Sequence, residues 1–257
     1  MNLEKVNCLV LAGGSGDSPL EKRGGVSSKA LIKMKDGREM IRFIIETMQE
    51  LKELKEITVI GPEELQDISS DYGAKFVIQE DCITDNIIKG SKVFQKDKSI
   101  IVSSSDIPFI SKEAISDFLE RSYPGDHDFY YPLISKECFP PEIKKTFVTL
   151  KEGTFAGGNI FRLNPKKLQQ FGDLTEKIMM SRKRPLKMAS LFGIAIPFLY
   201  LVGGLSIDKI LDRINRYNIS AKPIFSHFFE LGMDVDDQHD LETIEEIMKN
   251  RPFKERV

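Results

Sequence analysis

The stretch Val6-Asn7-Cys8-Leu9-Val10-Leu11-Ala12-Gly13-Gly14-Ser15-Gly16 decides the fold of this chain. Its apolar first half predicts a buried strand, and its second half predicts a glycine-rich loop whose backbone passes close to a ligand. Glycines let successive backbone amides converge on an anion. The stretch matches neither common phosphate motif, because GxxxxGK[ST] is absent and the third glycine of GxGxxG is missing. A tight turn without a ligand therefore stays open as the alternative.

Strands and helices alternate through the first half of the chain. This alternation predicts βαβ units and a mostly parallel sheet in an α/β fold. We expect strands at 6–11, 57–60, 74–78 and 99–103, and helices at 40–51, 62–70, 84–94 (capped by Thr84 or Asp85) and 111–121 (capped by Ser111).

The second half of the chain has a different pattern. Two expected strands, 129–134 and 146–150, flank the proline-rich loop Cys138-Phe139-Pro140-Pro141. Glycines interrupt the apolar run 154–161. The last third is expected to be helical, apart from a short strand at 224–225, and to end in a helix over 239–250.

Composition and charge exclude several classes of protein. The 257 residues carry a formal net charge of −2, so we expect no nucleic-acid partner. Three widely spaced cysteines without a CxxC motif favour a reducing compartment, and we expect a cytoplasmic protein. The N-terminus lacks the pattern of a signal peptide.

Residues 188–207 form an uncharged, apolar stretch that is long enough to span a membrane. Pro197 and the pair Gly203-Gly204 interrupt it, so we expect two buried helical pieces rather than a membrane span. The same stretch could be the face of a homodimer, or an apolar surface for another partner.

Asp106 follows the apolar run Ile100-Ile101-Val102 and the serines 103–105. In an open α/β sheet, ligands bind beyond the carboxyl ends of the strands. A carboxylate at that position suits Mg²⁺, which takes one or two protein carboxylates together with substrate phosphates. The alternative is a helix cap, a role for which Ser111 is better placed.

A second acidic segment, Met233-Asp234-Val235-Asp236-Asp237-Gln238-His239-Asp240, lies near the C-terminus. Alternation along a strand would place Asp234 and Asp236 on one face, where two carboxylates repel unless a cation lies between them. Asp237 and Asp240 have the spacing of a helix cap and its third residue. We therefore assign Asp236, and after it Asp234, to a metal. An ordinary acidic helix start is the alternative.

The order of LAGGSG, a downstream lysine, SSSDIPF, TFAGGNIF and GMDVDDQHDLE resembles the MobA-like nucleotidyltransferases, from Leu11 to Leu241. The resemblance implies a Rossmann-like three-layer α/β sandwich of the glycosyltransferase-A, or nucleotide-diphospho-sugar transferase, type with a mixed, mostly parallel sheet. We expect one domain over 1–257, in which 129–222 form an acceptor-side and helical insertion region.

The resemblance also implies roles for particular residues. Lys29 and Asp106 would be catalytic, and Asp106, Asp236 and Asp234 would bind Mg²⁺ or alternatively Mn²⁺. Acceptor binding is implied for Gly157, Gly158 and Asn159. Contacts with the nucleotide are implied for Leu11, Ala12, Gly13, Gly14, Ser15, Gly16, Lys29, Asp85, Asn86 and Ser105.

The implied reaction is nucleotidyl transfer from an NTP to a small-molecule acceptor that bears a phosphate or a hydroxyl, with release of pyrophosphate. A phosphate acceptor needs no general base, which agrees with the isolated positions of His127 and His227. Many relatives carry an arginine where this chain has Asp17-Ser18-Pro19. Either Lys22 or Arg23 replaces that arginine, or the triphosphate binds more weakly. An NTP-binding regulatory module without transfer activity is the alternative function.

Overall fold

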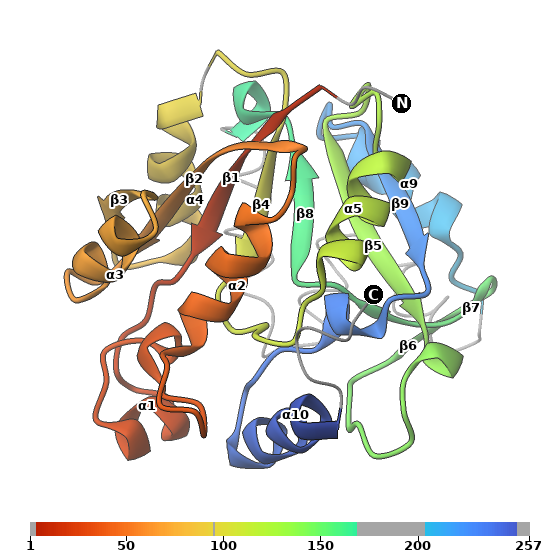
Figure 1. Ribbon diagram of the computed structural model, residues 1–257. Coiled ribbons are helices and arrows are strands. Elements are labelled where there is room, and N and C mark those ends of the chain that lie inside the picture. Colours follow the sequence, from red (N-terminus) through yellow and green to blue (C-terminus); the bar gives the residue numbers. More distant parts are fainter. Residues whose placement is uncertain (1–3, 95, 169–203, 251–257) are drawn as a thin grey trace.

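The computed structural model describes residues 4–94, 96–168 and 204–250 (Figure 1). Within them, one mixed sheet has the strand order β3-β2-β1-β4-β8-β5-β7-β6, and β9 pairs with β5. The strands are β1 (Val6–Leu11), β2 (Leu54–Gly61), β3 (Lys75–Ile78), β4 (Ile100–Ser104), β5 (Phe129–Ser135), β6 (Val148–Leu150), β7 (Gly153–Gly157), β8 (Ile160–Leu163) and β9 (Ala221–Ser226).

Helices lie on both sides of this sheet. The α-helices are α1 (Pro19–Gly24), α2 (Met40–Gln49), α3 (Leu65–Asp71), α4 (Ile83–Ser91), α5 (Lys112–Arg121), α9 (Ile207–Asn215) and α10 (Gln238–Asn250). Short 3-10 helices are η1 (Lys29–Leu31), η2 (Lys92–Phe94), η3 (Lys136–Cys138), η4 (Pro165–Lys167) and η5 (Phe229–Gly232).

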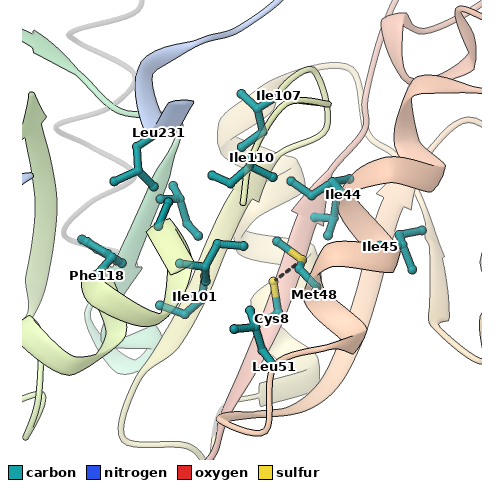
Figure 2. Close-up of a cluster of buried hydrophobic side chains, with 14 of the residues drawn as sticks. Cys8, Ile44, Ile45, Met48, Leu51, Ile101, Ile107, Ile110, Phe118 and Leu231 are labelled. Carbon is teal, nitrogen blue, oxygen red and sulfur yellow. Dashed lines mark hydrogen bonds between the residues drawn. The ribbon is translucent and has the colours of Figure 1, made fainter. Parts of the chain in front are cut away.

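The central strand β1 shows why the fold has three layers. Its successive side chains point to opposite faces of the sheet. Cys8 is buried against α2, where its thiol donates to the Met48 sulfur at 3.4 Å (Figure 2). Leu9 faces the other side and packs so closely on α4 that a Cβ on Gly90 would lie 2.6 Å from it. The predicted α/β sandwich is thus confirmed.

The parallel half of the sheet contains the point where the strand order reverses. β1 pairs in parallel with β2 on one side and with β4 on the other, so that Leu11 lies between Ile60 and Ser104. Ligands of open α/β sheets bind beyond the carboxyl ends of the strands at such a point. The glycine loop after β1 and Asp106 after β4 therefore start from adjacent positions.

The other half of the sheet is antiparallel around β5, apart from its parallel pairing with β9. β7 and β8 pair with the same edge of β5 at different positions, and the chain bends between them at Gly157 and Gly158. A Cβ on Gly158 would lie 2.5 Å from the Pro132 ring, so the bend needs glycine there. This bend directs Asn159 toward the carboxyl end of β4.

Several predicted elements are confirmed, among them β1 with its predicted bounds and α5 with Ser111 as its N-cap. The predicted cap of α4 is wrong. Cys82 is the N-cap, and its sulfur accepts from the Asp85 amide at 3.4 Å, so neither Thr84 nor Asp85 has that role. α3 begins later than predicted because Leu65 donates to the carbonyl of Pro62 in a preceding turn.

The acidic segment at 233–236 is not a hydrogen-bonded strand. It is an irregular stretch between η5 and α10, yet its alternate residues still face one side, because Val235 between them is fully buried. Residues 188–203 of the predicted apolar stretch lie outside the described residues. Within the part of the chain that is described, no helix is long and apolar enough to cross a membrane.

Candidate active site

The glycine loop is held by side chains from two other segments. The Ser28 hydroxyl donates to the carbonyl of Ala12 at 2.7 Å. The Gln79 amide forms two hydrogen bonds with the backbone of Gly14, accepting from its N–H at 3.0 Å and donating to its carbonyl at 2.7 Å. A Cβ on Gly14 would lie 2.5 Å from the carbonyl oxygen of Ser27. The loop is therefore fixed in position, and glycine is required at its centre.

The segment after the loop has a local structural role. Ser18 caps α1 by accepting from the Glu21 amide, Glu21 accepts from the Ser18 amide in return, and Pro19 takes the first helical turn. Lys22 lies 3.5 Å from Asp17 on the surface. Asp17-Ser18-Pro19 thus starts a helix, and Lys22 partly neutralises Asp17.

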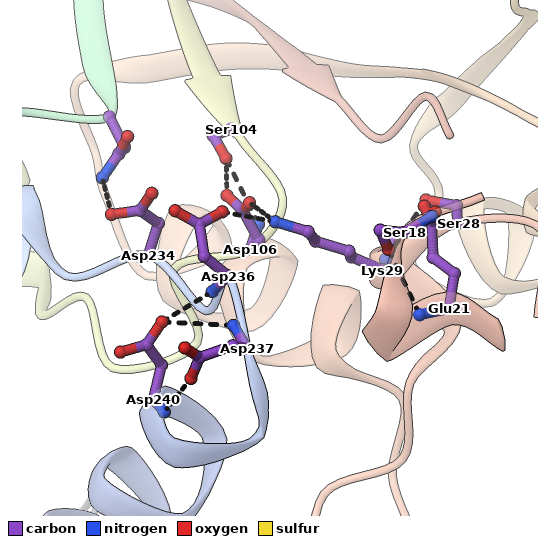
Figure 3. A network of polar contacts seen from close by, with 12 residues as sticks. Ser18, Glu21, Ser28, Lys29, Ser104, Asp106, Asp234, Asp236, Asp237 and Asp240 are labelled. Carbon is purple, nitrogen blue, oxygen red and sulfur yellow. Dashed lines mark hydrogen bonds and ion pairs between the residues drawn. The ribbon is translucent and has the colours of Figure 1, made fainter. Parts of the chain in front are cut away.

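Lys29 lies between two carboxylates. Ser28 caps the short η1 helix, from which Lys29 extends so that its ammonium lies 2.6 Å from Asp236 and 3.4 Å from Asp106 (Figure 3). Partial burial disfavours the charged ammonium. The attraction of Asp106 and Asp236 outweighs this cost and raises the pKa of Lys29 above its ordinary value. Lys29 is therefore a fixed positive charge at the end of β4.

Asp106, Asp234 and Asp236 come together in one cluster, in which one oxygen of each lies within 4.8 Å of the others. A backbone bond brings them together, because the Val235 amide donates to the Asp106 carbonyl at 2.8 Å. This bond places the neighbours of Val235 on the same side, next to Asp106. The Asp106 carboxylate also accepts from the hydroxyl of Ser104.

The electrostatics of the cluster favour a cation. Burial raises the pKa of Asp106; Lys29 partly offsets this effect, and nearby Asp236 adds to it. Lys145, in the loop after the proline-rich segment, donates to Asp234, and Asn159 donates to the same carboxylate at 3.2 Å. Burial lowers the pKa of Lys145 in spite of its acidic neighbours. Lys29 therefore pairs with Asp106 and Asp236 of the cluster, and Lys145 pairs with Asp234.

Two other residues predicted to contact the nucleotide, Asn86 and Ser105, lie beside the glycine loop. Asn86 is buried, and its side-chain oxygen accepts from the backbone N–H of Glu80 at 2.6 Å. The side-chain nitrogen of Asn86 would lie 3.0 Å from a Cβ on Gly13. Ser105 is also buried, with its N–H bonded to the Leu11 carbonyl at 3.1 Å. Asp85 is exposed and points to Cys82.

The predicted acceptor residues lie on the opposite side of the acidic cluster from the glycine loop. A Cβ on Gly157 would collide with the Tyr131 hydroxyl. The Gly158 amide donates to Pro132, and the Asn159 amide donates to Leu231 at 2.7 Å. The glycines therefore serve the bend of the backbone, whereas the side chain of Asn159 reaches the acidic cluster.

Two residues of the site escaped prediction from the sequence. Gln79 follows the predicted strand 74–78, and a polar residue at a strand end could have been noticed there. Lys145 belongs to a Lys144-Lys145-Thr146 stretch that has no motif around it, so only the tertiary structure reveals its contact with Asp234.

The chain is similar to known proteins in both sequence and structure. The model of the MobA-like NTP transferase domain matches residues 8–163. Among the curated proteins, no match was found. A structure described as a hypothetical transferase from Thermus thermophilus is similar, with 28% identity and a TM-score of 0.78, covering 92% of this chain and 99% of that one.

More distant structures share the fold. Molybdopterin-guanine dinucleotide biosynthesis protein A from Archaeoglobus fulgidus has 16% identity and a TM-score of 0.54, covering 95% of this chain and 100% of its own. 4-Diphosphocytidyl-2C-methyl-D-erythritol synthase from Anaerococcus prevotii has 14% identity and a TM-score of 0.59, with 96% of each chain covered. Because the matched domain covers more than half of its length and the described residues have the fold of these transferases, the chain belongs to the MobA-like NTP transferase family and is a nucleotidyltransferase.

Proposed function

We propose that this nucleotidyltransferase moves a nucleoside monophosphate from an NTP to a small-molecule acceptor bearing a phosphate or a hydroxyl, with release of pyrophosphate and with the help of Mg²⁺ or Mn²⁺. One observation carries the proposal. Lys29 and three carboxylates converge beyond the carboxyl ends of β1 and β4, next to the glycine loop. This is the place where a parallel sheet binds its ligand.

The donor set suits a hard divalent cation. Asp106, Asp234 and Asp236 offer only oxygen atoms, and Mg²⁺ is usually held by one or two carboxylates together with substrate phosphates. These three residues would hold the ion, which would neutralise charge on the phosphates when bound. Each of the three carboxylates already has a lysine as a partner, so the cluster is suited to positive charge even in the protein alone.

The NTP is proposed to lie against the glycine loop. Backbone amides of residues 11–16 would meet its phosphates, because glycines let these amides converge. The buried residues Asn86 and Ser105 and the exposed residue Asp85 would complete the nucleotide side of the site. Gly157, Gly158 and Asn159 would bound the acceptor on the other side.

The chemistry then follows from the position of the charges. An acceptor oxygen attacks the α-phosphorus, a new P–O bond forms, and the bond to the bridging oxygen breaks so that pyrophosphate leaves with the electron pair. A hydroxyl acceptor also loses its proton, which water takes up. Lys29 lies where it can stabilise the charge that develops on pyrophosphate. Such a transfer needs orientation and charge stabilisation rather than a covalent intermediate.

Ligand-induced thermal stabilisation tests the proposal. The four NTPs are added to the protein in turn, with Mg²⁺ or with EDTA. One NTP should raise the melting temperature with Mg²⁺ and much less with EDTA, because a ligand of the folded state stabilises it by mass action. Asp106→Asn should remove this metal-dependent shift, whereas Asp212→Asn, at an exposed position on α9, should keep it. No shift with any NTP would refute the proposal.

Further features of the protein are proposed with this function. We propose that residues 1–257 act as one domain, with 129–222 on the acceptor side, and that the protein works in the cytoplasm. The cysteines support a reducing compartment, since the three of them are free. The partners proposed are an NTP and a small acceptor, without nucleic acid or membrane. A homodimer through 188–207 stays a prediction.

A further inference from the structure

Asn159, between β7 and β8, forms hydrogen bonds with three segments around the acidic cluster. Its backbone N–H donates to the carbonyl of Leu231 in η5 at 2.7 Å, and its carbonyl accepts from the N–H of Ser104 at the end of β4 at 2.9 Å. Its side-chain amide donates to Asp234 at 3.2 Å. This one residue therefore connects the strand that precedes Asp106 with the segment that carries Asp234.

The backbone of Asn159 has little freedom to move. Its partner Leu231 is fully buried, and so is Ile160, which follows it and pairs with β4. The bend before it is tight, because a Cβ on Gly158 would lie 2.5 Å from the Pro132 ring. A short side chain on a fixed backbone keeps the amide nitrogen in one place beside the acidic cluster.

Asp234 receives two donors on the same oxygen. Lys145 and Asn159 both donate to its Oδ1. The side chain of Asp234 is mostly buried, with 18% of it exposed. These two bonds leave Oδ2 for a cation that is held together with Asp106 and Asp236, which lie beside Asp234 (Figure 3).

The two donors differ in how they respond to a divalent cation. Lys145 is positively charged, so the cation repels it. Lys145 also belongs to a segment, 140–147, that makes one hydrogen bond or ion pair to other segments among the described residues, the bond to Asp234 itself. Asn159 is neutral and has a fixed backbone. It can therefore keep Asp234 in place while the cation is bound.

We propose that Asn159 is a positioning residue that holds Asp234 in the orientation in which it binds the divalent cation, and that Lys145 does not share this role. The inference rests on the proposed function, in which the acidic cluster holds Mg²⁺ or Mn²⁺. It gives Asn159 a second task beside the acceptor. A donor that orients a metal-binding carboxylate typically contributes about ten- to a hundredfold to metal affinity.

Titration of the nucleotide-free protein with Mn²⁺ in a calorimeter tests the inference without turnover. Asn159→Ala removes the amide and keeps both backbone bonds, so it should weaken Mn²⁺ binding about tenfold. Asn159→Leu, which keeps the size of the side chain, should show the same loss. Lys145→Met removes a competing positive charge and should bind Mn²⁺ at least as tightly as the unmodified protein. Asn215→Ala, at an exposed position on α9, is the matched control and should change nothing.

A double-mutant cycle shows whether Asn159 acts through Asp234. In Asp234→Ala, the carboxylate that Asn159 holds is missing. Adding Asn159→Ala to this variant should cause no further loss of Mn²⁺ affinity, because the effects of residues that act through one contact do not add. Additive losses would overturn the inference, since Asn159 would then influence the cation by another route.

Two results for the single variants would also overturn the inference. One is an unchanged Mn²⁺ affinity in both Asn159→Ala and Asn159→Leu, which would leave Asn159 to the acceptor alone. The other is an equal loss in Asn159→Ala and Lys145→Met, because the neutral donor would then have no special role.

Failure of the proposed metal site would be visible before any variant of Asn159 is compared. In that case the unmodified protein would not bind Mn²⁺, or Asp106→Asn would bind it equally well. Either result refutes the metal site, and the role of Asn159 is refuted with it. If the unmodified protein binds Mn²⁺, Asp106→Asn does not, and Asn159→Ala binds it normally, the metal site stands and only the role of Asn159 is refuted.

Discussion

The backbone amide of Val235 donates to the carbonyl of Asp106 at 2.8 Å, and this bond joins the end of β4 to the segment before α10. Val235 is fully buried, so its neighbours Asp234 and Asp236 must turn toward the surface beside Asp106. The acidic cluster is therefore a product of backbone pairing between two distant parts of the chain. The expected consequences for the site and the fold can be measured.

Lys29 should compete with divalent cations for the acidic cluster. Its ammonium lies 2.6 Å from Asp236 and 3.4 Å from Asp106. Lys29→Met removes that positive charge, so Mn²⁺ should bind the nucleotide-free protein several-fold more tightly in calorimetry. The same change should slow transfer about a hundredfold or more, because the positive charge that stabilises the leaving pyrophosphate is lost. Weaker Mn²⁺ binding in the variant would contradict this competition.

Gly14 should not tolerate a side chain. A Cβ at this position would lie 2.5 Å from the carbonyl oxygen of Ser27, so Gly14→Ala forces the backbone apart. We expect a loss of about 1–3 kcal/mol in unfolding free energy, measured in urea, together with loss of the NTP-induced thermal shift. The control is Gly24→Ala in α1, where the nearest atom would be 3.4 Å away and alanine favours the helix. Similar behaviour of the two variants would refute the close contact at Gly14.

Gln79 should act as a positioning residue for the glycine loop. Its side chain forms both of its hydrogen bonds with the backbone of Gly14. Gln79→Ala should raise the KM for the NTP several-fold and leave kcat within about threefold, because the loop loses its position while the acidic cluster is unchanged. Gln66→Ala, exposed on α3, is the matched control. A fall in kcat with an unchanged KM would point to a direct role in the chemistry instead.

Asp128 should make the stability of the fold depend on pH in the acidic range. Burial opposes its charge, but bonds from the Ser220 amide and hydroxyl and from Asn164 outweigh burial, so its pKa is lowered. A carboxylate with a lowered folded-state pKa stabilises the fold above its ordinary pKa of about 3.9. That contribution is lost as the pH falls from there through the folded-state pKa.

Replacement of this carboxylate gives the measurement. Asp128→Asn should reduce the unfolding free energy by about 2 kcal/mol at pH 7, the size expected for hydrogen bonds to a charged group. The difference between the two proteins in urea unfolding should shrink as the pH falls below about 3.9 and the carboxylate of the unmodified protein becomes protonated. A difference that stays constant with pH would show that charge is not the cause.

Particular residues show how far the sequence alone could lead. The strand Val6–Leu11 has the bounds that the sequence predicts, because a short apolar run that ends at glycines is typical of a buried strand. Ser111 as a helix cap and the Asp237–Asp240 pair were also predicted, since these patterns act within a few residues. The predicted N-cap of α4 is wrong because the sulfur of Cys82 accepts the hydrogen bond that a side-chain oxygen usually accepts at that position.

Contacts between distant segments needed the structure. No local pattern links Gln79 to Gly14 or Lys145 to Asp234, because each pair meets only after the sheet has formed. Likewise, Asp234 and Asp236 were expected on one strand face, yet the side that they share is set by the burial of Val235.

The sequence by itself determined the α/β class, the glycine loop after the first strand, the acidic residue after a strand end and the acidic segment before the last helix, since local propensity and hydrophobic periodicity act within a short window. Only the tertiary structure decided that Lys29, Asp106, Asp234 and Asp236 share one site and that Lys145 and Asn159 donate to it. The physical reason is that these residues are brought together by the pairing of β1 with β4 and by the bond from Val235 to Asp106, which depend on the packed core as a whole.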